Sequence, residues 1–180
     1  KPIRQVTEIN SDIQKGIAAA ESIFEILDTE PEVDNGSLEL DTVKGGFEFK
    51  DVNFQYSAEG RMILQDINFS VEPGETIALV GSSGSGKTTL VSLIARFYNL
   101  DQGSILLDGV DVKDFTLENL RGHIGQVSQN VTLFNDTVLN NIAYGDLSSR
   151  SLKEVKAAAA VAHAYAFIEQ LSDGYQTQVG

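Results

Sequence analysis

The sequence predicts an α/β fold with an antiparallel β subdomain, preceded by an N-terminal amphipathic helix. Apolar residues recur at spacings of three and four over residues 3–28, which is helical periodicity. They alternate with polar residues between residues 47 and 71, which is strand periodicity. A short, continuously apolar segment at 76–80 then leads into a glycine- and serine-rich loop and a second helical pattern. Strands and helices are therefore expected to alternate beyond residue 45.

The composition limits the classes of function. The 180 residues include 26 acidic and 13 basic side chains, a formal net charge of −13, which argues against binding nucleic acid by phosphate neutralisation. The absence of cysteine excludes disulfides, a cysteine-ligated zinc site and thiol catalysis. Two histidines, His123 and His163, are too few for a histidine metal cluster. No apolar run approaches the ~18 residues of a membrane helix and no signal peptide is evident, so this stretch is expected to be soluble.

The expected N-terminal helix has a single apolar stripe and therefore needs a partner for that face. Pro31 and the cluster at residues 34–37 end the helical pattern. The stripe consists of Ile3, Val6, Ile9, Ile13, Ile17, Ala20, Phe24 and Leu27.

An acidic linker is expected after this helix, with a domain boundary near Gly45-Gly46. Eight acidic residues and no basic ones lie between residues 21 and 41, and the rest of the chain has 18 acidic against 13 basic side chains. The charge excess is thus concentrated in one segment. Its simplest interpretation is a solvated helix end and linker.

The elements beyond this boundary follow from period and turn residues. Pro73-Gly74 and Asp108-Gly109 predict turns, the second inside a hairpin, and the segment 76–80 has the composition of a strand buried on both faces. Ser151 and Glu154 form a capping box that opens a helix through Ala160. Further helices are expected at 90–98 and up to about Leu171; the expected strands are 47–49 with 52–56, 67–71, 76–80, 104–107 with 110–112, and 123–127.

The strongest motif is Gly81-x4-Gly86-Lys87-Thr88, which has the spacing G-x-x-x-x-G-K-[ST]. Small residues let successive backbone N–H groups turn inward and cradle phosphate oxygens. A helix that starts at Lys87 directs its positive dipole end to the same place. We therefore predict a nucleotide-binding loop, in which Lys87 binds the terminal phosphates and the Thr88 hydroxyl ligates Mg²⁺.

The residues on both sides of this loop resemble the nucleotide-binding domain of ATP-binding-cassette (ABC) transporters, over residues 45–180. The later segments look most like the branch of that family that exports lipid A in bacteria. The resemblance implies a P-loop NTPase core of the ABC ATPase type, incomplete because it stops before the signature motif. The segments that carry the resemblance are 47–56, 63–69, 81–89, 101–109, 127–130, 133–138 and 140–144.

In this family the ATPase domain is fused behind membrane helices. The resemblance therefore implies that residues 1–30 are the cytoplasmic extension of the last transmembrane helix, 31–44 an acidic linker and 45–180 the N-terminal portion of the nucleotide-binding domain. The implied location is the cytoplasmic face of the bacterial inner membrane, and the implied function is the coupling of ATP hydrolysis to export of a lipid or another hydrophobic substrate. The implied partners are the chain's own transmembrane domain, through coupling helices near Phe134, and a second ATPase domain in a head-to-tail homodimer.

The resemblance also assigns roles to single residues. Tyr56 matches the aromatic residue that stacks on adenine, and Gln129 matches the glutamine that contacts Mg²⁺ and the attacking water. Gln126 is a nearby rival, but Ser128 and Asn130 favour Gln129. The expected cofactors are ATP and Mg²⁺, Lys87 and Gln129 are the expected catalytic residues, and Thr88 and Gln129 the metal ligands. The expected nucleotide contacts are Tyr56, Gly81, Ser82, Ser83, Gly84, Ser85, Gly86, Lys87, Thr88 and Thr89.

Two other features imitate functional groups. Asp108 ends an apolar run as a magnesium-binding aspartate does, but Asp108-Gly109 is a hairpin turn and no second carboxylate follows it. His123 and His163 correspond to no catalytic histidine of the family. The family's signature loop, general-base glutamate and switch histidine would lie beyond Gly180, so we expect the chain alone to bind ATP weakly or not at all and to leave it unhydrolysed. A missing core strand should also leave apolar surface bare.

Alternatives of other classes remain open at this point. The phosphate-loop motif is shared by soluble ATPases and nucleotide kinases that have no link to transport. A third reading is an interaction module in which the N-terminal helix drives oligomerisation.

Overall fold

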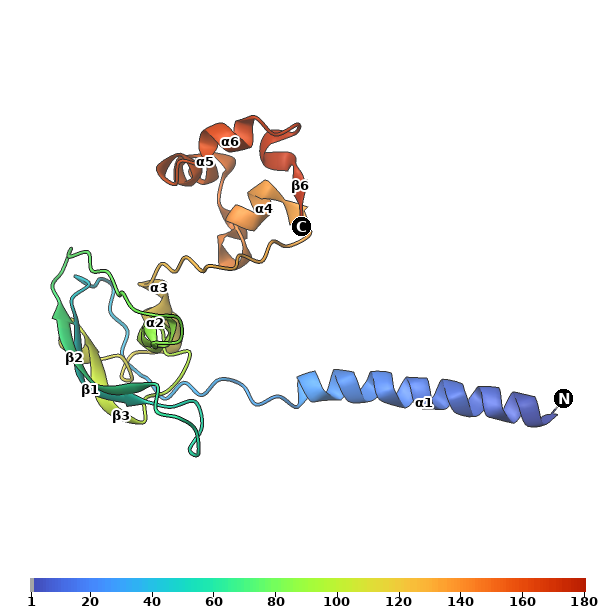
Figure 1. Ribbon diagram of the computed structural model, residues 1–180. Coiled ribbons are helices and arrows are strands. Elements are labelled where there is room, and N and C mark those ends of the chain that lie inside the picture. The colour runs from blue at the N-terminus through green and yellow to red at the C-terminus, as the bar shows by residue number, and fades with distance from the viewer. Residues whose placement is uncertain (1) are drawn as a thin grey trace. The chain divides into compact units, whose positions relative to one another are not determined.

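The computed structural model describes residues 2–180, with side chains from residue 13 onward (Figure 1). The chain forms two compact units that divide after Gly125. This division was not predicted from the sequence, which placed residues 45–180 in one domain. Among the described residues, no helix is both long enough and apolar enough to cross a membrane.

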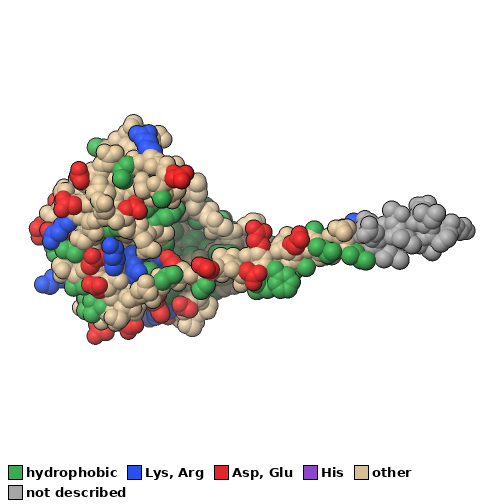
Figure 2. All heavy atoms as spheres, turned by 90° about the horizontal axis from the view of Figure 1, so that it is seen from below, with side chains coloured by type: hydrophobic (Ala, Val, Ile, Leu, Met, Phe, Trp, Pro, Cys, Tyr) green, Lys and Arg blue, Asp and Glu red, His purple; other side chains and the backbone are tan. Residues whose placement is uncertain are grey.

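The N-terminal helix α1 spans Pro2–Leu27, in agreement with the helix expected over residues 3–28. The side chains of Ile3, Val6 and Ile9 in the apolar stripe lie outside the described residues. The stripe residues from Ile13 onward are exposed apart from the half-buried Ala20. Figure 2 shows hydrophobic and acidic side chains along the described part of this helix.

The first unit contains a four-stranded antiparallel sheet in the order β2-β1-β3-β4. Strand β1 is one strand with an irregularity between Phe49 and Val52, where Asp51 has a φ of 48°. This irregularity explains why the alternation predicted two short strands at 47–49 and 52–56, because an extra residue shifts the side-chain alternation. The strands are β1 Phe47–Phe54, β2 Leu64–Val71, β3 Gln102–Leu107 and β4 Val110–Asp111, and β3 and β4 form the expected hairpin.

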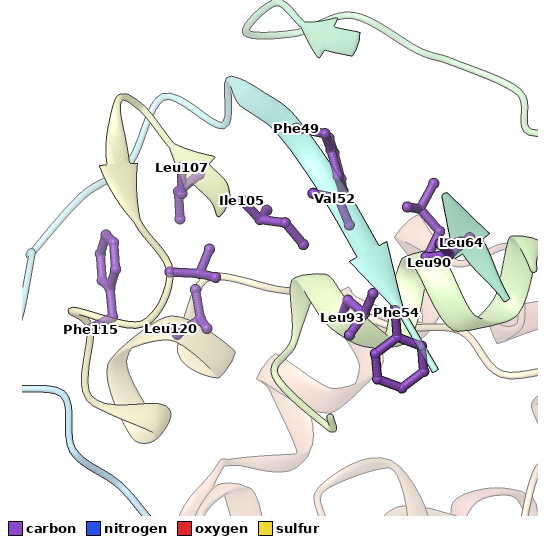
Figure 3. Close-up of a cluster of buried hydrophobic side chains, with 11 residues drawn as sticks. Phe49, Val52, Phe54, Leu64, Leu90, Leu93, Ile105, Leu107, Phe115 and Leu120 are labelled. Carbon is purple, nitrogen blue, oxygen red and sulfur yellow. The ribbon is translucent and has the colours of Figure 1, made fainter. Parts of the chain in front are cut away.

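Two helices complete the first core. Helix α2 spans Lys87–Ile94, and α3 spans Leu117–Gly122 and was not predicted. Leu93 of α2, Ile105 of β3 and Leu120 of α3 are almost entirely buried in one cluster (Figure 3). Helix α2 ends four residues before the predicted end at 98, because Arg96 adopts a left-handed φ of 52°. The core therefore fixes α2 against the sheet, and α2 carries the phosphate-loop lysine.

Two predicted strands did not form. Residues 76–80 and 123–127 have no strand assignment, and Val80 and Val127 are 88% and 96% exposed. A strand that is buried on both faces needs hydrogen-bonded neighbours, and within residues 2–180 no strand pairs with either segment. Apolar surface is bare beside the sheet, as the sequence predicted. A groove of about 350 Å³ between the sheet and α2 includes Phe69, Ile77 and Leu90 in its lining.

The second unit is small and mainly helical. Ser151 caps α5 as predicted: its hydroxyl accepts the Glu154 N–H at 3.4 Å, and its own N–H donates to the Glu154 carboxylate at 2.9 Å. Val155, Ala159 and Ile168 lie in a separate buried cluster of this unit. Its elements are β5 Asp136–Thr137, α4 Val138–Ile142, a 3₁₀ turn at Gly145–Ser149, α5 Leu152–Val161, α6 Tyr165–Glu169, a 3₁₀ turn at Gly174–Gln176 and β6 Gln178–Val179, which pairs with β5.

The acidic linker is not solvated throughout, and this corrects its sequence interpretation. Residues 32–40, which we call the strap, pack against α3 and the segment that precedes it within the first unit. The Glu32 carboxylate accepts two hydrogen bonds from the Arg121 guanidinium, at 2.6 and 2.7 Å. Asp34 accepts the Leu117 N–H at 2.8 Å, and Leu38 forms a parallel bridge with Phe115. Two of the three acidic residues of the strap, Glu32 and Asp34, thus have specific partners that lie about 80 residues further along the chain.

Candidate nucleotide-binding site

Helix α2 begins without a side-chain cap. Its N-cap residue is Gly86, in the left-handed conformation with a φ of 90°, and no side chain accepts a hydrogen bond from the first turn. The backbone N–H groups of a first helical turn have no partners within the helix. The start of α2 therefore offers N–H donors and a positive dipole end to an anion, as the sequence predicts.

Glycine is required within the phosphate loop, residues 81–89. Gly84 and Gly86 have positive φ angles of 77° and 90°, which other residues rarely adopt. A Cβ atom at Gly86 would lie 2.8 Å from the Leu64 side chain, and one at Gly81 would lie 2.7 Å from the Ser85 hydroxyl. The loop thus keeps its curve only with these small residues.

The ammonium group of Lys87 lies inside the curve of this loop. It donates hydrogen bonds to the carbonyl oxygens of Gly81 at 3.0 Å and Ser82 at 2.8 Å, and to the Ser85 hydroxyl at 3.3 Å. An open hollow of about 530 Å³ includes Gly81, Ser85 and Lys87 in its lining. The positive charge is therefore held where the loop would receive a phosphate group.

The donor set fits a nucleoside triphosphate with Mg²⁺. The Thr88 residue is exposed beside Lys87, as a metal ligand must be. Among the described residues, no group of three or more histidines, aspartates or glutamates could hold a metal ion on its own. An Mg²⁺ ion at this loop could take a hydroxyl ligand from Thr88, and most of its other ligands would then be phosphate oxygens and water, which is how Mg²⁺ is commonly bound.

Tyr56 lies next to the phosphate loop, as the sequence prediction requires. Its hydroxyl is 2.8 Å from the hydroxyl of Thr89, in the first turn of α2. The residue is 56% exposed, and its ring makes edge contacts with Phe54 and Tyr98, each at 5.0 Å between ring centroids. The structure thus brings the predicted base-binding ring and the predicted phosphate-binding loop together.

The sequence did not predict the contact between Tyr98 and the Tyr56 ring. Tyr98 follows α2 by four residues, and it was assigned only as the end of the helical pattern. The one sequence feature that could have indicated this contact is an aromatic side chain shortly after the phosphate-loop helix. The signal is weak, because an aromatic residue at a helix end is more often part of the core.

Gln129 is an exposed residue of the second unit. Next to it, the Ser128 hydroxyl donates a hydrogen bond to the Asn130 carbonyl at 2.7 Å. Gln126 is exposed as well, so burial does not separate the two glutamines. The assignment of Gln129 to Mg²⁺ and to the attacking water stays a prediction.

Phe134 is exposed rather than packed in a core. Its ring stacks on Tyr144, with 4.2 Å between centroids and 7° between ring planes. Asn141 holds its backbone by accepting the Phe134 N–H at 2.8 Å and donating to its carbonyl at 3.0 Å. The docking of coupling helices near Phe134 stays a prediction.

Asp108 is a structural residue. Its carboxylate accepts hydrogen bonds from the backbone N–H groups of Lys44, Gly45 and Gly46. Desolvation raises the pKa of Asp108, but these backbone hydrogen bonds outweigh it, so that the pKa lies below its ordinary value. The carboxylate therefore fixes the start of β1 against the β3–β4 turn, in agreement with its rejection as a metal ligand.

The histidines have structural surroundings too. The Nε2 atom of His123 forms a hydrogen bond of 2.8 Å with the Leu40 carbonyl of the strap. His163 is exposed and has a φ of 56° after the end of α5. His123 is therefore bound to the strap, and His163 lies in the turn that follows α5.

Comparison with known proteins gives concordant results. Residues 64–180 match the family described as ABC transporter. The whole chain is 59% identical to 30% of the ATP-dependent lipid A-core flippase of Pseudomonas syringae pv. tomato, and 56% identical to 31% of the protein with the same name in Hahella chejuensis. A solved structure of a bacterial Atm1-family ABC exporter with ATP bound is similar to this chain, with a TM-score of 0.77 and 38% sequence identity. The match covers 99% of this chain and 32% of the exporter chain. The chain thus spans about a third of the length of these relatives.

Proposed function

Because the chain belongs to the ABC transporter family, we propose that it is the ATP- and Mg²⁺-binding part of an ABC exporter that couples ATP hydrolysis to transport. The observation that carries this proposal is the uncapped start of α2 with the Lys87 ammonium group inside the phosphate loop. Helix start, lysine and base-binding ring are present in one unit. An interaction module would not need them together.

We propose a lipid such as lipid A, or another hydrophobic molecule, as the exported substrate. Support comes from the relatives named as lipid A-core flippases, which match over the whole chain at 56–59% identity. The ATPase segment would lie at the cytoplasmic face of the bacterial inner membrane. Its partners would be its own transmembrane domain, through coupling helices near Phe134, and a second copy of the ATPase domain in a head-to-tail homodimer.

Each residue of the site has a separate part in the proposed reaction. The N–H groups of the phosphate loop and Lys87 bind the phosphates and stabilise the negative charge that shifts during phosphoryl transfer. Thr88 would supply a hydroxyl ligand to Mg²⁺, and the ion would contribute positive charge that offsets the charge of the phosphates. Tyr56 stacks on the base, and Gln129 orients the attacking water. We assign no general base to these residues, so this chain provides the charge-stabilising part of the site.

The test is the ATPase activity of the natural full-length protein in lipid vesicles. We expect Lys87→Ala to lower the turnover number about 100-fold or more, because it removes a charge that stabilises the transition state. Lys153→Ala is the matched control, since Lys153 is an exposed lysine of α5 outside the phosphate-loop motif, and it should retain full turnover. Full turnover in Lys87→Ala would refute the proposal.

A second measurement separates transport from the soluble alternatives. We expect lipid A in the vesicles to raise the rate of phosphate release above the rate in phospholipid alone. A nucleotide kinase would instead transfer the phosphoryl group to a nucleoside monophosphate, which chromatography of the products detects. Phosphoryl transfer of that kind would support the soluble kinase.

A further inference from the structure

Tyr56 and the residue before it form hydrogen bonds with the segment that contains the phosphate loop and α2. Its hydroxyl pairs with the Thr89 hydroxyl at 2.8 Å, and Thr89 is only 6% exposed. The N–H group of the preceding residue, Gln55, donates to the Asp101 carboxylate at 2.8 Å. Thr89 lies at the start of α2 and Asp101 beyond its end. The two sides of the helical segment thus bind the tyrosine hydroxyl and the backbone of the residue that precedes it.

The ring itself is oriented by two other aromatic residues. Phe54 and Tyr98 each stand nearly perpendicular to the Tyr56 ring, at 85° and 80°. Phe54 is buried in the core at the end of β1, whereas Tyr98 is 46% exposed in the segment after α2. Perpendicular aromatic contacts of this kind favour one ring orientation. The Tyr56 ring therefore packs against Phe54 of the sheet and against Tyr98 in the segment after α2.

We propose that Tyr98 and Thr89 are positioning residues that hold the Tyr56 ring in register with the phosphate loop, so that a purine base and its triphosphate are bound as one rigid unit. This inference rests on the proposed function, because it takes Tyr56 to be the base-binding ring. Tyr98 contacts neither base nor phosphate in this arrangement and acts only through Tyr56. Tyr98 therefore contributes to the affinity for the base and not to the affinity for the phosphates.

Two ligands separate the base from the phosphates in the natural full-length protein. MgATP contains both parts, and magnesium tripolyphosphate contains only the phosphate part. We expect Tyr98→Leu to weaken MgATP binding about three- to tenfold, the loss that corresponds to one aromatic pair. Binding of tripolyphosphate should change less than about twofold. Tyr98→Phe keeps the ring and should restore the wild-type affinity for MgATP.

A double-mutant cycle tests whether Tyr98 acts through Tyr56. In the Tyr56→Ala background the ring is absent, so Tyr98→Leu should cause no further loss of MgATP affinity. Tyr56→Phe retains the ring and removes the contact with the Thr89 hydroxyl. It should weaken MgATP binding and leave tripolyphosphate binding unchanged.

Three results would overturn the inference while leaving the proposed function in place. Tyr98→Leu could bind MgATP as tightly as the wild type, could lose tripolyphosphate and MgATP affinity equally, or could retain its effect in the Tyr56→Ala background. The second of these results would show a general effect on the folded loop. Wild-type protein that binds neither ligand would instead overturn the proposed function and this inference together.

Discussion

Replacement of Arg96 by methionine gives a quantitative test of how the strap is held. Arg96 is 8% exposed, and its Nη1 atom donates to the Phe115 carbonyl at 2.8 Å and to the Val112 carbonyl at 3.4 Å. The same atom lies 3.9 Å from the Asp34 carboxylate. Methionine retains an apolar stem and adopts the left-handed backbone no more easily than arginine, so the variant removes mainly the guanidinium group.

The expected loss of local stability is about 2 kcal/mol. A buried carbonyl such as that of Phe115, left without a partner, costs about 1–3 kcal/mol. The ion pair with Asp34 adds less than about 1 kcal/mol, because that carboxylate is one-third exposed. An opposing gain comes from removing the Nε atom of Arg96, which is buried and has no hydrogen-bond partner within residues 13–180.

Hydrogen exchange measures this loss at the strap itself. The Leu38 N–H donates to the Asp114 carbonyl at 2.8 Å, and the Thr116 N–H donates to the Leu38 carbonyl at 3.0 Å. A loss of about 2 kcal/mol should accelerate the exchange of both amides about 30-fold.

Two control variants separate the effect of the ion pair with Asp34 from the effect of the planar donor group of Arg96. Asp34→Asn removes the charge and retains an oxygen that can accept the Leu117 N–H, so its effect should stay below about fivefold. Arg96→Lys keeps a charge and loses the planar donor group, so it should fall between wild type and methionine. Exchange in Arg96→Met within about threefold of wild type would refute the assigned role of the guanidinium group.

Two further predictions concern the strap and the start of α5. The hydrogen bond from Arg121 holds the pKa of Glu32 below its ordinary value, so this contact stabilises the strap above about pH 4.3 and is lost as the pH falls through the lowered pKa. The protection of the strap amides, which is their exchange rate relative to the intrinsic rate at the same pH, should therefore fall in acid in the wild type and depend less on pH in Glu32→Gln. Ser151→Ala should destabilise the second unit by about 1 kcal/mol in thermal unfolding, and Ser151→Thr much less; equal melting curves for all three proteins would contradict the cap.

The local elements of this fold could be predicted from the sequence, because their causes are local. Alternation of apolar residues defined β1 and β2, the Asp108-Gly109 turn defined the hairpin, and Ser151 with Glu154 defined the start of α5. The glycine spacing defined the phosphate loop for the same reason. In each case the residues that specify the structure lie within a few positions of one another.

The failures have a common physical cause, which is dependence on distant partners. Residues 76–80 have the composition of a strand, yet a strand exists only where another strand supplies hydrogen bonds. The acidic strap appeared solvated because its partners, Arg96 and Arg121, lie far along the sequence. Tyr98 was missed since its role depends on the position of Tyr56 in three dimensions.

The strap also has a consequence for the order of folding. Its contact between Glu32 and Arg121 joins residues 89 positions apart, whereas the β3–β4 hairpin closes through a turn of adjacent residues. Closing a long loop is entropically costly and becomes favourable only after the partner surface exists. We therefore expect the strap to dock after the sheet and α3 have formed. Glu32→Gln, which weakens the contact from the strap side, should then accelerate unfolding and leave the folding rate nearly unchanged.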